Sequence, residues 1–408
     1  MANVFGLIED RILKYGDKEP STSEREPFRI GYKELFGQAA KASPTSAASN
    51  LGGRKQFLLA LDGPGIPSDP FAYPLTWSKN NVIAVACGKD VYYQNLDTRA
   101  IVHLCEVEKS LYGRPRSVEW SVIEPTQLAI GTTLGSMQLW SVNSSKMLRS
   151  WKDEDSSSVG GMDWNEHLFT VGLDNGAVNF YDDRAAHMAN QLTMHQSKVH
   201  GVKWSTDRNY LATGDQQGVV YVWDARAGKT LANDSRMGGR ILHGDAPVKA
   251  LSWCPWQPDL LATGSTFPDG KIRVFSVKST SAIPQPRHVL TLCASITSLQ
   301  WSPHCKEILS THGHAWNPNA PLDSENARPV QVKSPLTHSI TVHSYPSYRR
   351  IVSVTAHVGP VGHSCLSPDG TMVFTICPAE EAMKMWKVWS LPPKPPKREG
   401  MYDKFRIR

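Results

Sequence analysis

The feature of this chain that most restricts its fold is an internal repeat. Between residues 70 and 390, an apolar run ending in Trp is followed by a turn, a segment resembling Leu-Ala-Thr-Gly, a polar turn and alternating apolar residues. The pattern returns after roughly 45 residues, a period typical of repeat architectures. The chain holds seven copies, whose leading residues are Trp77, Trp120, Trp164, Trp204, Trp253, Trp301 and, where Trp is replaced, Leu366.

The residues inside each copy indicate β-strands. Short runs alternate apolar and polar residues between Gly, Asp, Asn and Pro, as antiparallel strands joined by tight turns do. A copy that closes on Trp-Asp, as at Trp223-Asp224, is typical of WD-repeat propeller blades. Because one blade cannot bury both faces alone, seven must stack around an axis. We predict an all-β, seven-bladed WD-repeat β-propeller over residues 56–391.

Two pairs of histidines require separate interpretations. His195 and His243, the latter followed by Gly244, occupy the blade-start position at which a histidine hydrogen-bonds within its own blade. His312 and His314 form a His-x-His pair, but no third ligand has suitable spacing nearby. We therefore interpret the first pair as structural and predict no metal site at the second.

Segments outside the repeats differ from them in composition and in the structure that we expect. Residues 315–337, within the sixth copy, are polar and rich in Pro and Asn, which predicts a surface loop inserted between two strands. Residues 1–55 predict a largely extended N-terminal arm with a short helix, on which Val4, Ile8 and Ile12 share one face. Residues 38–56 are rich in Ala, Ser and Gly and predict a flexible linker. The arm could dock on another protein or on its own propeller.

Charge and composition narrow the classes of function. Net charge is +6, and residues 394–408 alone carry six basic and two acidic side chains, a net +4 that leaves +2 for residues 1–393. A basic C-terminal tail (392–408) is therefore expected, without the broadly basic surface that nucleic-acid partners require. No apolar run approaches the roughly 20 residues that span a bilayer, so we expect a soluble protein that is not secreted and has no membrane partner. The seven cysteines are scattered singly and predict reduced thiols.

Motifs for catalysis do not appear in the sequence. It contains no nucleophile elbow, P-loop, kinase set or zinc motif. We therefore expect a binding platform without cofactors rather than an enzyme, since a propeller by itself hosts many roles.

Several stretches outside the general repeat pattern resemble one family. They are "LDGPGIPSDPFAYPLTWSKNN" at the first blade, "VKALSWCPWQPDLLATG" in the fifth, "WSPHCKEILSTHG" in the sixth, and the final Ile407-Arg408. Together they resemble the fizzy and fizzy-related proteins, substrate-recruiting coactivators of the anaphase-promoting complex, over roughly residues 57–408. The resemblance implies an adaptor that activates this ubiquitin ligase in cell-cycle control. Departures from the family pattern in the KEN site and the sixth and seventh blades suit a specialised relative, and mitotic and meiotic use both stay open. Its implied partners are the ligase core subunits and degron-bearing substrates such as cyclins, in nucleus and cytoplasm. A WD-repeat scaffold unrelated to ubiquitylation is the alternative.

The resemblance also implies a site for the destruction-box degron between the first and last blades. The family pairs an acidic residue with the arginine of the degron, and Asp62 holds that position, beside Leu61 in an expected apolar pocket. Alternatively, Asp62 only closes the turn before Pro64.

A second implied site, for the Lys-Glu-Asn (KEN) degron on one face of the propeller, fits less well. Asp69 matches the family's aspartate. The other family positions carry different residues here, namely Gln216, Gly218, Phe267 and Lys384. Because unpaired polar groups of a ligand are costly, we predict altered or weak KEN recognition.

Attachment to the ligase is implied at both ends of the chain. The terminal Ile407-Arg408 matches the family's Ile-Arg tail. The family's C-box pattern is missing, and residues 10–20, with Arg11, Ile12 and Leu13, resemble a segment that lies downstream of it. Either the chain as given begins after the C-box, or this member engages the ligase differently.

Overall fold

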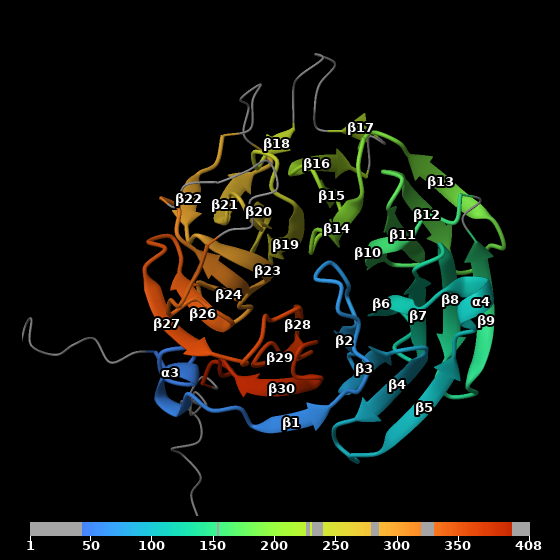
Figure 1. Ribbon diagram of the computed structural model, residues 1–408, viewed down its shortest axis with the longest axis horizontal. Helices are drawn as coiled ribbons and strands as arrows, with labels where there is room; N and C mark the ends of the chain where they lie inside the picture. Colours follow the sequence, from blue (N-terminus) through green and yellow to red (C-terminus); the bar gives the residue numbers. More distant parts are fainter. Residues whose placement is uncertain are drawn as a thin grey trace, which may run out of the picture. The chain divides into compact units, whose positions relative to one another are not determined.

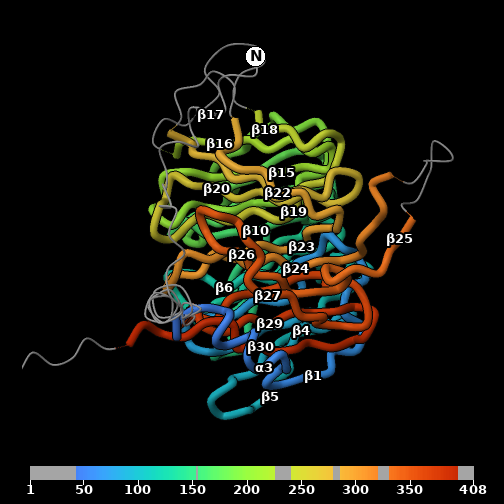
Figure 2. The backbone as a smooth tube through the Cα atoms, turned by 90° about the vertical axis from the view of Figure 1, so that its left-hand side faces the viewer, coloured from blue at the N-terminus to red at the C-terminus, as the bar shows by residue number. Residues whose placement is uncertain are grey.

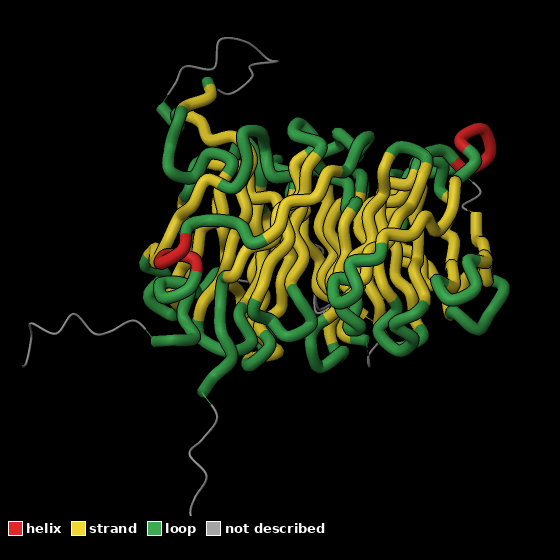
Figure 3. The backbone as a smooth tube through the Cα atoms, turned by 90° about the horizontal axis from the view of Figure 1, so that it is seen from below, coloured by secondary structure: helices red, strands yellow, loops and turns green. Residues whose placement is uncertain are grey.

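The computed structural model describes residues 43–152, 155–225, 229–230, 240–278, 285–319 and 330–393. Within them, seven antiparallel sheets stand around a common centre, each with four principal strands (Figure 1). Seen from below, nearly all regular structure is strand, with two one-turn helices at the periphery (Figure 3). The predicted all-β, seven-bladed propeller is confirmed.

Blades 1 to 6 take their principal strands in chain order from the centre outward. Blade 1 consists of β2 (Leu75–Trp77), β3 (Val82–Cys87), β4 (Asp90–Asn95) and β5 (Ile101–Glu106). Blade 2 consists of β6 (Pro115–Trp120), β7 (Gln127–Thr132), β8 (Ser136–Ser141) and β9 (Lys146–Lys152), after the helix α4 (Lys109–Tyr112). Blade 3 consists of β10 (Val159–Asn165), β11 (Leu168–Leu173), β12 (Val178–Asp182) and β13 (Met188–Leu192).

Blades 4 to 6 follow the same order, and blades 4 and 6 each carry one additional strand. Blade 4 consists of β14 (Val199–Trp204), β15 (Tyr210–Asp215), β16 (Val219–Asp224) and β17 (Lys229–Thr230), and β18 (Ile241–Leu242) also pairs with β16. Blade 5 consists of β19 (Val248–Cys254), β20 (Gln257–Ser265), β21 (Lys271–Ser276) and β22 (His288–Thr291). Blade 6 consists of β23 (Ala294–Trp301), β24 (Glu307–Trp316), β26 (Ser339–Ser344) and β27 (Arg350–Thr355), with β25 (Gln331–Val332) paired to β24.

Blade 7 closes the ring with strands from both ends of the propeller. Its inner strands are β28 (His363–Leu366), β29 (Met372–Cys377) and β30 (Ala382–Lys387), and its outer strand is β1 (Leu59–Asp62). Leu59 pairs with Met385 and Asp62 with Ala382, so β1 lies against β30 in Figure 1. The predicted destruction-box residues therefore belong to the strand that closes the ring.

Three of the leading Trp residues, Trp204, Trp253 and Trp301, join neighbouring blades. Trp204 donates its indole N–H to Thr170 Oγ1 at 2.9 Å, in the preceding blade. Trp253 donates to the carbonyl of Lys203 at 2.9 Å, again one blade back. Because the rings are buried while the indole N–H groups are paired, each satisfies both the apolar and the polar demands of the interface.

The blade-start histidines are structural, as predicted. His195 bonds Asp215 through Nδ1 and Thr213 through Nε2, both at 2.8 Å, and Trp223 donates to the same threonine. His243 repeats the arrangement in the next blade, with Thr263 Oγ1 at 2.8 Å from Nε2.

The same arrangement recurs in blade 7, where sequence interpretation did not find it. His357 bonds Thr375 and Glu380, and Trp386 donates to that threonine. Among the described residues, His357, Cys377 and Glu380 form the one cluster spaced for a metal ion. Both ring nitrogens of His357 already have protein partners, which explains the cluster as part of the blade.

The expected flexible linker differs from the structure in its second half. Ala47 and Leu51 are fully buried against β26, β27 and Trp389, and residues 51–54 form the helix α3 (Leu51–Arg54). α3 packs against β27, and both Figure 1 and Figure 2 show it beside that strand. Residues from Pro44 onward belong to the same compact unit as the propeller.

The described ends of the insertion in blade 6 are paired strand and buried side chains rather than surface loop. Residue pairs Ala315–Val332 and Trp316–Gln331 extend the sheet into it. Trp316 is buried, with its ring edge-on to Phe267 at 5.2 Å. Leu336 is buried as well, so apolar residues at both ends of the insertion hold it to the blade.

Candidate functional site

A pocket of about 550 Å³ opens where blade 1 meets blade 7. Its wall is mostly apolar and comes from both blades, including Ile83 and Val85 of β3 and Met383 of β30. β4 adds the polar side chains of Asp90 and Gln94. Leu61 and Asp62 line it from β1, and the Asp62 side chain is exposed. The structure thus brings together the two residues predicted for the destruction box, in the inter-blade position expected.

The turn after β1 is fixed without help from Asp62. Gly63 donates its N–H to the carbonyl of Glu381, and Gly65, at φ +76°, donates to Glu381 Oε1 at 2.9 Å. In the described part of the chain, the Asp62 carboxylate has no hydrogen-bond or ion-pair partner. A free carboxylate at the edge of an apolar pocket fits a ligand contact better than turn closure.

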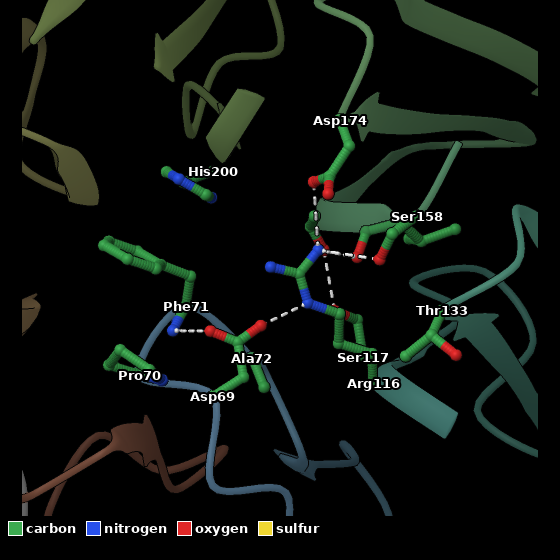
Figure 4. A network of polar contacts seen from close by, with 12 residues as sticks. Asp69, Pro70, Phe71, Ala72, Arg116, Ser117, Thr133, Ser158, Asp174 and His200 are labelled. Atoms are coloured by element: carbon green, nitrogen blue, oxygen red, sulfur yellow. Dashed lines mark hydrogen bonds and ion pairs between the residues drawn. The ribbon is translucent and has the colours of Figure 1, made fainter. Parts of the chain in front are cut away.

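The carboxylate of Asp69, the first residue of the predicted KEN site, forms an ion pair with an arginine of the same chain. Arg116 on β6 donates Nε to Asp69 Oδ2 at 2.6 Å (Figure 4). Its Nη1 donates to the carbonyl of Val159 at 2.7 Å and lies 3.3 Å from Asp174. Although burial alone would raise the pKa of Asp69, the Arg116 guanidinium and the N–H of Phe71 hold it below its usual value.

Gln216 is connected to this network through stacked rings. Phe71 stacks on His200 with ring centres 3.9 Å apart and planes at 12°, and His200 Nε2 donates to Gln216 Oε1. Burial lowers the pKa of His200 to about 4, so its ring is neutral near pH 7. Gly218 adopts φ +79° in the following turn and supplies no side chain.

Phe267 lines a cup of about 520 Å³. The cup is also lined by Phe71, which precedes β2 of blade 1, by His314 of blade 6, and by Val361 and Pro378 of blade 7. Its lining is mostly apolar and includes neither Gln216 nor Gly218.

Lys384 is separated from the cup. Its Nζ donates to Glu380 at 2.9 Å and to the carbonyl of Ala356 at 3.2 Å, on the outer side of blade 7. The five residues predicted for the KEN site therefore do not form one cluster in this structure.

Sequence interpretation did not single out two basic residues of the inner strands that contact the predicted KEN region. One is Arg116, and the other is Lys249, whose buried Nζ donates to the carbonyls of Pro70, Ala72 and Gly362 at 2.7 to 2.9 Å. Burial lowers the pKa of Lys249 to about 7. Lys249 is the one charged residue of β19, which is otherwise apolar or small, and this lone charge was the available signal. β6 carries Glu119 as well as Arg116, so Arg116 had no such signal.

The predicted ligase-docking residues Arg11, Ile12, Leu13, Ile407 and Arg408 lie outside the described residues. In the part that the structure describes, no helix has the length and apolar character needed to cross a membrane.

These features define a WD-repeat propeller that offers pockets between and above its blades. A family model described as the CDC20/Fizzy WD40 domain matches residues 61–386. The chain belongs to this family.

Individual relatives agree with the assignment. WD repeat-containing protein slp1 of Schizosaccharomyces pombe is 33% identical over 81% of this chain and 60% of its own length. The anaphase-promoting complex subunit cdc20 of Dictyostelium discoideum is 28% identical over 94% of this chain and 71% of its own length. Cell division cycle 20.5, a cofactor of the APC complex in Arabidopsis thaliana, is 30% identical over 83% of this chain and 69% of its own length. The chain thus spans about two thirds of the length of these relatives.

A solved structure shows the same fold. A chain in the crystal structure of the mitotic checkpoint complex superposes with a TM-score of 0.70 at 32% identity, covering 83% of this chain and 96% of that one.

Proposed function

We propose that this protein is a non-catalytic substrate adaptor and activator of the anaphase-promoting complex, acting in cell-cycle control in nucleus and cytoplasm. The family and the names of its members support the general role. The observation that carries substrate binding is the apolar pocket edged by the unpaired Asp62 carboxylate. It suits substrates such as cyclins that present a destruction box.

The pocket supplies the two kinds of contact that such a degron needs. The arginine of the degron pairs with Asp62, and an apolar side chain enters beside Leu61 against Met383. A charge-assisted hydrogen bond contributes about 1.5–3 kcal/mol. Because β1 closes the ring, the same strand both completes blade 7 and presents the site.

Replacing Asp62 by Asn is expected to weaken binding of a destruction-box peptide by about tenfold or more, since each 1.4 kcal/mol is tenfold. Isothermal titration with the full chain measures this. Asp245→Asn, an exposed aspartate in the turn before blade 5, is the matched control and is expected to bind as the unaltered protein does. Equal affinities for all three proteins would exclude Asp62 as the contact.

Attachment to the ligase is proposed to use Ile407-Arg408, assisted by the segment that contains Arg11, Ile12 and Leu13. A terminal arginine combines a guanidinium with the chain carboxylate, a pair available only at the last residue. Deleting Ile407 and Arg408 is expected to reduce recovery of the ligase core in a pull-down while leaving destruction-box affinity intact. Equal recovery with and without these residues would exclude the tail as the attachment point and favour an unrelated scaffold.

A further inference from the structure

A groove separate from the pocket of blades 1 and 7 runs along the outer side of blades 6 and 7. It encloses about 570 Å³. One wall is formed by Lys55 and Phe57, just before β1, and the other by Lys333 of the insertion and by Val358, after β27. Lys384 and Trp386 of β30 lie in its lining as well. We call it the blade 6–7 groove.

Exposed apolar side chains lie in the blade 6–7 groove. Phe57 is 47% exposed and Val358 is 86% exposed. Phe57 is held in place because its ring packs edge-on against Trp386, with ring centres 5.9 Å apart. Covering such surface removes apolar area from water, so an apolar side chain of a ligand is favoured here.

The charged residues that line the groove are all lysines. Lys384 is neutralised by Glu380, whose carboxylate also accepts from His357 and from the N–H of Val358. Lys55 and Lys333 differ, because no carboxylate of the described residues lies within ion-pair distance of either, and both are exposed. Two free cations therefore flank an apolar surface.

We propose that the blade 6–7 groove binds an extended segment of a partner protein that carries an apolar or aromatic side chain between carboxylates. The apolar residue covers Phe57 and Val358, and the acidic residues pair with Lys55 and Lys333. The chain's own tail, with a net charge of +4, has the wrong sign for this site. The proposal does not depend on the destruction-box pocket, which lies on the opposite side of blade 7.

The test selects peptides from a displayed library of random heptapeptides against the full chain, with counter-selection against Lys55→Glu/Lys333→Glu. Both lysines are exposed, so the double variant keeps its fold. Peptides that depend on the groove are expected to contain Asp or Glu beside an apolar residue. Retrieval of no such peptides, or of groove-dependent peptides without acidic residues, overturns the proposal.

Fluorescence polarisation then tests each contact with a selected peptide. Affinity is expected to fall about tenfold in Lys55→Glu/Lys333→Glu and in Val358→Asp, and to be unchanged in Lys109→Glu/Lys146→Glu, exposed lysines of the first two blades. A peptide with Lys in place of its acidic residues is expected to regain binding to the charge-reversed variant. Equal binding by all variants overturns the proposal, as does concentration-dependent self-association, measured by sedimentation, that disappears in the double variant. Destruction-box affinity in the same variants remains unchanged, which separates this result from the proposed function.

Discussion

Replacing Glu307 by Leu is expected to release residues 44–55 from the propeller. The Glu307 carboxylate is buried at the start of β24 and accepts hydrogen bonds from Ser46 Oγ at 2.5 Å, the N–H of Ala47 at 3.0 Å and Trp389 Nε1 at 2.8 Å. Leucine keeps the bulk but leaves three donors without an acceptor. At about 1–3 kcal/mol for each buried unpaired group, a loss of about 3 kcal/mol is a low expectation.

The measurement is limited trypsin digestion, followed by sequencing of the cut ends. Arg54 and Lys55 are exposed side chains on a backbone that α3 holds in place, so cleavage requires this segment to open. A loss of about 3 kcal/mol predicts about a hundredfold faster cleavage there. Urea unfolding, followed in parallel, reports how much of the loss reaches the whole propeller.

Glu307→Gln is the matched control. Its amide oxygen can accept from Ala47 and Trp389 while its amino group donates to Ser46 Oγ, so the three groups keep partners. A small change is expected. Cleavage of Glu307→Leu at the rate of the unaltered protein would show that the docked segment is held by the burial of Ala47 and Leu51 alone.

The order of residues 44–55 could not be predicted from the sequence. Their Ala, Ser and Gly residues predicted a flexible linker because nothing local in them requires order. The order comes from Glu307, 260 residues further along the chain, and from the groove that buries Leu51. The propeller itself could be predicted, since alternation, turn residues and the leading Trp are local signals repeated seven times.

One of the two candidate sites could be predicted from the sequence, and the other could not. Leu61 and Asp62 could be placed because motif similarity and a closed ring together put the first and last blades side by side. The pairing of the KEN positions could not be predicted, because Asp69 forms its ion pair with a residue of another blade. Arg116 is 47 residues from Asp69, and only the register of β6 against its neighbours brings its guanidinium to that carboxylate.

Replacing Arg116 by Ser is therefore expected to free the Asp69 carboxylate and to restore part of a site for a positively charged side chain. In the unaltered protein, Arg116 holds the Asp69 carboxylate that would receive the lysine of a KEN peptide, so such a peptide is expected to bind more weakly than a destruction-box peptide. Freeing this carboxylate makes one charge-assisted hydrogen bond available, which predicts about a tenfold gain in KEN affinity. The gain stays partial because Gly218 and Phe267 still lack the polar groups of the family's site.

Isothermal titration with both peptides measures the change. Arg116 is 7% exposed and pairs with two carboxylates, so its removal is also expected to lower the free energy of unfolding by about 2 kcal/mol. Lys198→Ser is the matched control, because Lys198 is 54% exposed and pairs with the same Asp174. An exposed pair contributes about 0–1 kcal/mol, so neither stability nor KEN affinity should change there. Equal affinity of the unaltered protein for the two peptides, or a folded Arg116→Ser protein with no gain, would show that Asp69 is not the residue that limits KEN recognition.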